Sequence, residues 1–318
     1  MSYEIFFLGN RGVGKTTMLA VMAHYLAKDI DKFDPLHLEP DDEKFKELNR
    51  RWSELLATIK NAGVIPQRPA TEDIIEHRFR FSDGTKSNKS IACSFIDTPG
   101  GSTYDADPEL CQRVRKAVAI ICIVDAVDLM EFPEEEAIDR CAVSGIQRLL
   151  KGVANLRKED DMAMPIKCLF ILTKCEKYMH STDETLNAQA LSQKFTACFR
   201  QVLKISNLTS FYLPVETLGC LEFSHFDENG FPQWRKCHES PRPVNIYQPL
   251  CFAMSELLEK LEEEKNILQY IWDKVLDIFG VNDYKKYRQQ LSDIAGDATE
   301  LSKYDRATGE LSKTTSFE

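Results

Sequence analysis

The stretch from Gly9 to Thr16 has the spacing of a phosphate-binding loop, G-x-x-x-x-G-K-[ST]. A short apolar run, Tyr3 to Leu8, precedes it, and Thr17 to Ile30 carries apolar residues at helical spacing. Glycines let the backbone turn tightly, so that its N–H groups and the helix N-terminus point at a polyanion. The alternative is a glycine-rich turn that binds nothing, but the flanking strand and helix favour the phosphate site.

The residues expected to form this phosphate site are Asn10, Arg11, Gly12, Val13, Gly14, Lys15, Thr16 and Thr17. The Lys15 ammonium can reach the β- and γ-phosphates, and the Thr16 hydroxyl can ligate Mg²⁺. A second motif, D-x-x-G, runs from Asp97 to Gly100 at the end of another predicted strand. The carboxylate can hold Mg²⁺ through water, and the Gly100 N–H can bond the γ-phosphate. The alternative reading of Asp97 is an ordinary turn aspartate.

The composition excludes several classes of function. The chain has 318 residues, 40 Lys and Arg against 50 Asp and Glu, and a net charge of −10. An acidic protein is unsuited to non-specific nucleic-acid binding, which depends on cations that neutralise phosphates. No signal peptide and no apolar stretch of membrane-spanning length is present, and the ten cysteines form no C-x-x-C pair. We therefore expect a cytoplasmic protein with no intrinsic membrane segment and no nucleic-acid partner.

Hydrophobic periodicity predicts strands that alternate with helices, and hence a mainly parallel sheet covered on both faces. The predicted strands are Tyr3 to Leu8, Ile74 to Phe81, Ser90 to Ile96, Ala117 to Val124, Ile166 to Leu172 and Phe211 to Val215. After the first helix, further helices are predicted at Asp41 to Ala62, Glu134 to Leu156, after a capping box at Ser181 to Glu184, and at Pro249 to Phe279. We expect Glu222 to Gln248 to be a long loop and Asp305 to Glu318 to be mobile.

The residues Thr173 to Glu176 follow the fifth predicted strand. Together with the two motifs above, they make the chain similar to the Ras-like, translation-factor-related (TRAFAC) class of P-loop small GTPases, which carries N-K-x-D, or T-K-x-D, at this strand end. The resemblance implies that Lys174 lies along the guanine ring and that Glu176 accepts hydrogen bonds from guanine N1 and N2. Adenine lacks those donors. Glu for Asp departs from the family pattern, and the alternative is a Lys–Glu pair on the surface.

The resemblance extends to other loops of the family. The last base-binding loop corresponds to Glu216 to Gly219, where Thr217 matches the family's S-A-K only in position. The first switch corresponds to Val64 to Thr71, and Thr71 is the candidate for the threonine that ligates Mg²⁺ and senses the γ-phosphate. Arg68 lies three residues earlier, as in heterotrimeric G-protein α subunits, where the arginine stabilises transition-state charge. An exposed loop arginine without that role is the alternative.

Two departures from the family indicate slow hydrolysis. Many members have a glutamine after D-x-x-G to orient the attacking water, whereas this chain has Gly101. Arg11 stands where close relatives often have glycine, and a bulky side chain there crowds the γ-phosphate. We expect slow intrinsic hydrolysis that depends on a partner, on a second subunit or on Arg68. The helical insert, the Pro-x-x-Pro before Thr71 and D-T-P-G are also similar to GTPases of bacterial conflict and defence gene clusters.

Other residues are assigned no chemistry. Asp125 and Asp128 follow the fourth predicted strand and are expected to bound a loop. The distal half of the last helix, Leu268 to Phe279, is either core or a partner-binding surface. Four residues close in sequence fit no standard zinc-ligand spacing: Cys220, His225, Cys237 and His238.

The resemblance implies a three-layer P-loop NTPase fold with a six-stranded sheet, ordered 2-3-1-4-5-6 with the second strand antiparallel. We expect a GTPase domain over residues 1–280, with a helical insert at 31–63, a loop at 222–248 and a helix at 249–280. Residues 281–318 would form a partly mobile extension. The cofactor would be Mg²⁺, and the ligand GTP or GDP.

The function favoured by the sequence is a GTP-controlled switch read by an effector or regulator protein, with self-association as a further alternative. Lys15 and Mg²⁺ would neutralise γ-phosphoryl charge, and Thr71 and Gly100 would report its presence. One rival is a P-loop ATPase or kinase, which applies if Thr173 to Glu176 does not read guanine. The other is an interaction module that holds nucleotide without useful hydrolysis.

Overall fold

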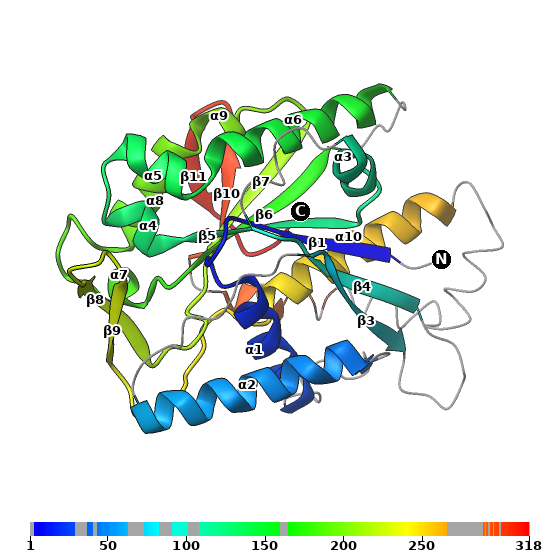
Figure 1. Ribbon diagram of the computed structural model, residues 1–318. Helices are drawn as coiled ribbons and strands as arrows, with labels where there is room; N and C mark the ends of the chain where they lie inside the picture. Colours follow the sequence, from blue (N-terminus) through cyan, green and yellow to red (C-terminus); the bar gives the residue numbers. More distant parts are fainter. Residues whose placement is uncertain are drawn as a thin grey trace.

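The structure is a computed structural model, and it describes residues 3–28, 37–40, 43–62, 73–82, 91–100, 108–159, 165–265, 289, 291, 293–294, 296–298 and 300–317. A nine-stranded sheet crosses the molecule in the order β11-β10-β7-β6-β5-β1-β4-β3-β2 (Figure 1). Its strands are β1 (Tyr3–Leu8), β2 (His37–Pro40), β3 (Ile75–Ser82), β4 (Ile91–Asp97), β5 (Ala119–Asp125), β6 (Ile166–Thr173), β7 (Leu208–Pro214), β10 (Ser302–Asp305) and β11 (Glu310–Lys313).

The centre of the sheet has the predicted topology. Strands β4, β1, β5, β6 and β7 pair in parallel, and β3 pairs antiparallel with β4. The predicted order 2-3-1-4-5-6 is thus present as β3-β4-β1-β5-β6-β7. The predicted number of six strands is wrong, because β2 adds an antiparallel strand beside β3 and the pair β10–β11 extends the edge beside β7.

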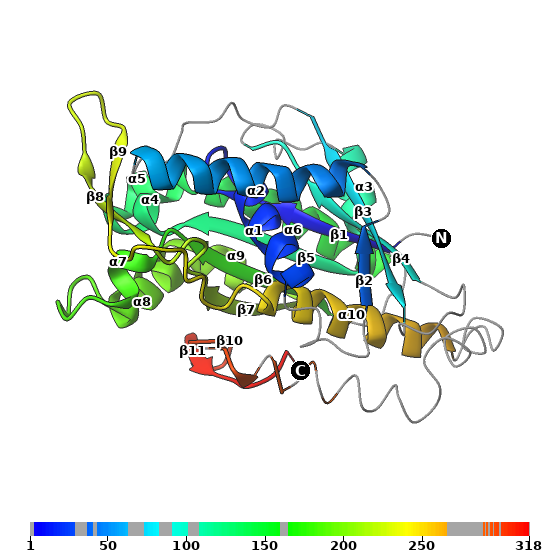
Figure 2. The ribbon, with the colours of Figure 1, turned by 90° about the horizontal axis from the view of Figure 1, so that it is seen from below.

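Helices cover both faces of the sheet, as Figures 1 and 2 show. One face carries α1 (Lys15–Lys28), α2 (Glu43–Ala62) and α10 (Gln248–Lys265). The other carries α3 (Pro108–Val114), α4 (Ala126–Met130), α5 (Glu134–Arg140), α6 (Val143–Glu159), α8 (Ala188–Cys198) and α9 (Arg200–Leu203). In β1, Ile5 and Phe7 belong to one core, and Phe6 and Leu8 belong to the other. This double burial explains why the central strands are continuous apolar runs in the sequence.

Two predicted helices differ from the observed ones. The helix predicted over Glu134 to Leu156 is divided into α5 and α6, because Ala142 between them takes a left-handed φ of 51°. The capping box at Ser181 to Glu184 does not open a helix. Instead, the Asn187 side chain accepts from the Ala190 N–H at 2.9 Å and caps α8. A short helix, α7 (Glu176–Met179), follows β6 directly.

The segment 222–248, expected to be a loop, contains most of a two-stranded hairpin of β8 (Leu221–Phe226) and β9 (Pro232–Lys236). The helix predicted over Pro249 to Phe279 is present as α10 as far as Lys265, and its distal half lies outside the described residues. Among the helices of the described ranges, none combines the length and the apolar character needed to cross a bilayer.

The tail Asp305 to Glu318, which we expected to be mobile, contains β11, and β10 ends where this tail begins. Phe317 of the tail is buried, and its ring lies 5.5 Å from Phe211 and 5.2 Å from Phe252, centroid to centroid. The sequence does not indicate this packing, because only isolated residues of the tail face inward and they are separated by short polar stretches.

Replacing Phe317 with alanine is expected to lower the free energy of unfolding by about 3 kcal/mol, since it removes a buried aromatic ring. Urea denaturation measures this change. The matched control is Ser312→Ala on the exposed face of β11, which should stay within about 0.5 kcal/mol of the wild type. Equal stabilities of the two variants would mean that the tail does not pack on the core.

Candidate functional site

The loop between β1 and α1 lies at the carboxyl edge of the parallel strands. Gly9, Gly12 and Gly14 have backbone φ values of 152°, 78° and 95°, which residues other than glycine rarely adopt. A Cβ on Gly9 would also lie 2.4 Å from the carbonyl oxygen of Ile123, inside atomic contact. The loop therefore has the glycine-dependent backbone that the sequence motif requires.

Lys15 is held inside this loop. Its Nζ donates to the carbonyl oxygens of Gly9 at 2.9 Å and Asn10 at 3.0 Å. Burial lowers the pKa of Lys15 to about 8, and the charge of Asp97 opposes that shift. A phosphate group at the loop would supply the counter-charge that this buried ammonium needs.

Asp97 meets Thr16 beside the loop. The Thr16 hydroxyl donates to Asp97 Oδ2 at 2.6 Å, while Oδ1 is buried without a hydrogen-bond partner among the described residues. Burial raises the pKa of Asp97, and the hydrogen bond from Thr16 and the charge of Lys15 oppose this. A hydroxyl and a carboxylate are oxygen donors of the kind Mg²⁺ takes, so these two residues fit the ion. The described part of the chain contains no cluster of three or more His, Cys, Asp or Glu residues that could hold a metal ion. The four residues considered for zinc, Cys220, His225, Cys237 and His238, therefore form no such cluster.

Gly100 packs directly on the phosphate loop. A Cβ at this position would lie 2.3 Å from the backbone nitrogen of Arg11, so only glycine allows the approach. The D-x-x-G motif and the loop are consequently in contact. The Arg11 side chain is exposed, and Thr17 is half-buried in the first turn of α1.

The predicted first switch lies outside the described residues. That segment, Val64 to Thr71, includes both Arg68 and Thr71, so their roles stay predictions.

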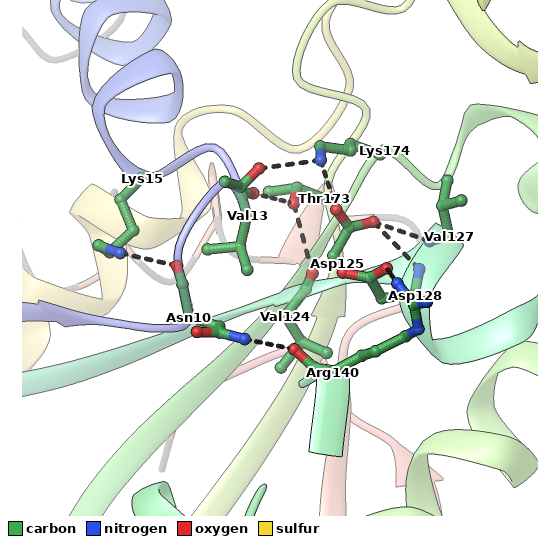
Figure 3. A network of polar contacts seen from close by, with 11 residues as sticks. Asn10, Val13, Lys15, Val124, Asp125, Val127, Asp128, Arg140, Thr173 and Lys174 are labelled. Atoms are coloured by element: carbon green, nitrogen blue, oxygen red, sulfur yellow. Dashed lines mark hydrogen bonds and ion pairs between the residues drawn. The ribbon is translucent and has the colours of Figure 1, made fainter. Parts of the chain in front are cut away.

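The segment after β6 is bonded to the phosphate loop, as Figure 3 shows. The Thr173 hydroxyl donates to the Val13 carbonyl oxygen at 2.7 Å, and Lys174 Nζ donates to the Gly12 carbonyl oxygen at 2.9 Å. Lys174 Nζ also forms an ion pair with Asp125. The Lys174 backbone has a φ of 58°, a conformation that costs a non-glycine residue about 1–2 kcal/mol. Strain of this kind is characteristic of functional sites.

Glu176 is buried at the start of α7. Its Oε1 accepts from the N–H groups of Leu218 at 3.4 Å and Gly219 at 3.2 Å, and its Oε2 has no hydrogen-bond partner in the described ranges. Burial raises the pKa of Glu176 to about 7, helped by Glu216 and opposed by these N–H groups. Thr217 is also buried, and its hydroxyl is likewise without a described partner. Glu176 is therefore not part of a Lys–Glu pair on the surface.

Sequence reasoning assigned no site role to two acidic residues, Asp125 at the end of β5 and Asp128 in α4. Asp125 Oδ1 accepts from the Val127 N–H at 2.9 Å and caps α4, while its Oδ2 pairs with Lys174. Burial and the charge of Asp125 raise the pKa of Asp128 to about 6. Asp125 was expected only to bound a loop. Its signal was its place: it ends a strand next to β1, and carboxyl ends of parallel strands form the ligand edge of such sheets.

A second contact holds the loop from the α5 side. The Asn10 side-chain amide donates to the Arg140 carbonyl oxygen at 2.5 Å, and the Arg140 guanidinium lies 3.6 Å from Asp128 (Figure 3). Asn10 Oδ1 in turn accepts from the Arg11 N–H at 2.8 Å. The phosphate loop is thus held by the side chains of Thr173 and Lys174 at the end of β6 and by the main-chain carbonyl of Arg140 in α5.

No protein-family model matches this chain, and no curated protein matches it. Among solved structures, it is similar to a chain of the "Signal recognition particle receptor SRb-GTP/SRX complex from Chaetomium thermophilum". The two are 14% identical, the similarity covers 63% of this chain and 80% of that one, and the TM-score is 0.33. Values this low support no conclusion about function. The strand order and the glycine loop of this chain are themselves compatible with a P-loop NTPase-like fold.

Proposed function

We propose that this protein binds GTP with Mg²⁺, hydrolyses it slowly and acts as a nucleotide-controlled switch for a protein partner. The observation that carries the proposal is the pair of hydrogen bonds between the segment after β6 and the loop after β1. They run from Thr173 to Val13 at 2.7 Å and from Lys174 to Gly12 at 2.9 Å. They hold the glycine loop beside the segment Thr173 to Glu176, which we propose as the base-reading segment, although the two are far apart in sequence.

The chemistry of Glu176 supports guanine as the base. Guanine presents an N1–H and an N2 amino group, and a buried carboxylate with a free oxygen can accept from both. Glu176 Oε2 is buried and lacks a partner among the residues described. Adenine would leave that acceptor unpaired, and an unpaired buried polar group is costly.

The chemistry of Lys15, Thr16 and Asp97 supports the triphosphate and Mg²⁺. The two oxygen-bearing side chains would hold the ion, which would neutralise charge on the γ-phosphoryl oxygens. Lys15 would do the same from the loop. Gly100 packs against Arg11, which supports a role in sensing whether the γ-phosphate is present, and Thr71 is proposed to sense it from the first switch.

Competition between GTP and ATP for one site tests the proposed base. We expect the wild type to prefer GTP, and Glu176→Ala to reduce that preference by at least about tenfold, because the variant loses charged hydrogen bonds worth roughly 1.5–3 kcal/mol. Glu184→Ala, at an exposed glutamate, is the control. A wild type that binds ATP as well as GTP would instead favour the ATPase or kinase alternative.

The affinity for GDP should fall as the pH drops below about 7, since the pKa of Glu176 is raised to about 7 and the charged carboxylate is a stronger acceptor for guanine N–H groups than the neutral acid. The affinity can fall by at most about tenfold per pH unit.

The stability of the ligand-free fold should change with pH in the opposite direction. The neutral acid is favoured in the folded protein, so its stabilising contribution is present below the ordinary pKa of 4.5 and is lost as the pH rises through about 7.

Isothermal titration calorimetry across this range measures the GDP affinity. Glu176→Gln keeps an acceptor oxygen but does not titrate, so the ratio of wild-type to variant affinity isolates the carboxyl group. A ratio that does not change with pH would exclude Glu176 from base recognition.

Hydrolysis by the purified chain should be slower than about 1 s⁻¹, as for GTPases that lack an activator. Single-turnover phosphate release from bound GTP measures it, with Lys15→Ala as the inactive control. If Arg68 is an internal arginine finger, Arg68→Ala should slow release further, by roughly 10³-fold or more. Turnover above that limit would contradict slow hydrolysis, and no release at all would favour a module that only holds nucleotide.

A further inference from the structure

The β8–β9 hairpin directly follows, in the chain, the loop whose N–H groups bind Glu176. The Gly219 N–H donates to Glu176, and β8 begins at Leu221. Figures 1 and 2 both show the hairpin beside α7, at the edge of the sheet where the glycine loop lies. The hairpin is therefore built next to the base end of the proposed nucleotide site.

Aromatic rings of the hairpin lie beside two lysines, Lys174 of the proposed base-reading segment and Lys177 of α7. Lys174 Nζ lies 5.8 Å from the centroid of the Trp234 ring, and Lys177 Nζ lies 4.9 Å from that of Phe223. The two rings contact each other edge to face, at 6.1 Å and 79°. Tryptophan is the aromatic side chain that attracts cations most strongly. Trp234 thus acts on the same ammonium that binds Gly12 and Asp125.

The hairpin also packs against Phe132, between α4 and α5. The Phe226 ring lies 5.1 Å from Phe132, and the Arg140 guanidinium stacks over Phe132 at 3.6 Å. Arg140 is the residue whose carbonyl oxygen binds Asn10 of the phosphate loop. The hairpin therefore contacts Lys174 directly and reaches Arg140 through Phe132.

We propose that Trp234 is a positioning residue that holds Lys174 along the base, and that the β8–β9 hairpin is the outer wall of the base end of the site. The proposal rests on the proposed function, because it needs a nucleotide base beside Lys174. A lysine stem has many rotamers, and fixing it beforehand reduces the entropy lost when the ligand binds. Trp234 acts through Lys174 and does not need to touch the nucleotide.

The test compares Trp234→Leu, which keeps apolar bulk but loses the ring, with Trp234→Phe, which keeps a ring. Dissociation constants are measured with Mg²⁺ for two probes, GDP and the base-free tripolyphosphate. We expect Trp234→Leu to weaken GDP binding about two- to fivefold, the effect of one partly exposed cation–π contact, and to leave tripolyphosphate binding unchanged. Trp234→Phe should recover most of the loss. Phe231→Leu, at the exposed turn of the hairpin, should bind both probes as the wild type does.

A double-mutant cycle with Lys174→Ala separates positioning from general support, because Trp234→Leu should have no further effect once the lysine is gone. Equal weakening of both probes, unchanged GDP binding, or full additivity in the cycle would overturn the role of Trp234. A wild type that binds tripolyphosphate but not GDP would overturn the proposed function itself, and the inference with it. Both sets of outcomes are distinguishable in the same titrations.

Discussion

Two hydrogen bonds across the edge of the sheet, from Thr173 to Val13 and from Lys174 to Gly12, determine how the rest of the site is arranged. They join the ends of β1 and β6, which have β5 between them. Strands in a sheet lie about 4.8 Å apart, so β1 and β6 are about 10 Å apart, and the Thr173 and Lys174 side chains reach across β5 to the glycine loop. The spacing between the two strands is set by strand pairing, and the two hydrogen bonds fix the glycine loop against the end of β6.

This edge also gathers buried ionisable groups whose charged forms are disfavoured by burial. Burial shifts the pKa of Lys15 downward and those of Asp97 and Glu176 upward, in each case toward the neutral form. Asp97 and Glu176 each keep one carboxylate oxygen without a described partner. Groups held at such a cost are characteristic of sites whose partners are ligands and ions. The same physical cause, exclusion of water, would strengthen their interaction with a charged ligand.

Much of the fold could be predicted because its signals are local. The glycine loop requires glycines wherever it occurs, and the central strands are apolar throughout because both faces are covered. The packing of the tail depends on contacts distant in sequence, because Phe317 contacts Phe211 and Phe252. That packing has no signature in the tail itself. The start of α8 is different, since Asn187 is a local cap that competes with the capping box at Ser181 to Glu184.

The sequence by itself predicted the glycine loop from Gly9 to Thr16, since residue type and spacing are sufficient for its backbone, and the resemblance to P-loop GTPases singled out the segment Thr173 to Glu176. The tertiary structure alone decided what surrounds them. Asp125 pairs with Lys174 because parallel strands end at a common edge, and Trp234 reaches the same lysine because a hairpin folds back beside α7. Ion pairs and aromatic contacts depend on distances in space, and a sequence pattern does not give the distances between residues that only the assembled sheet brings together.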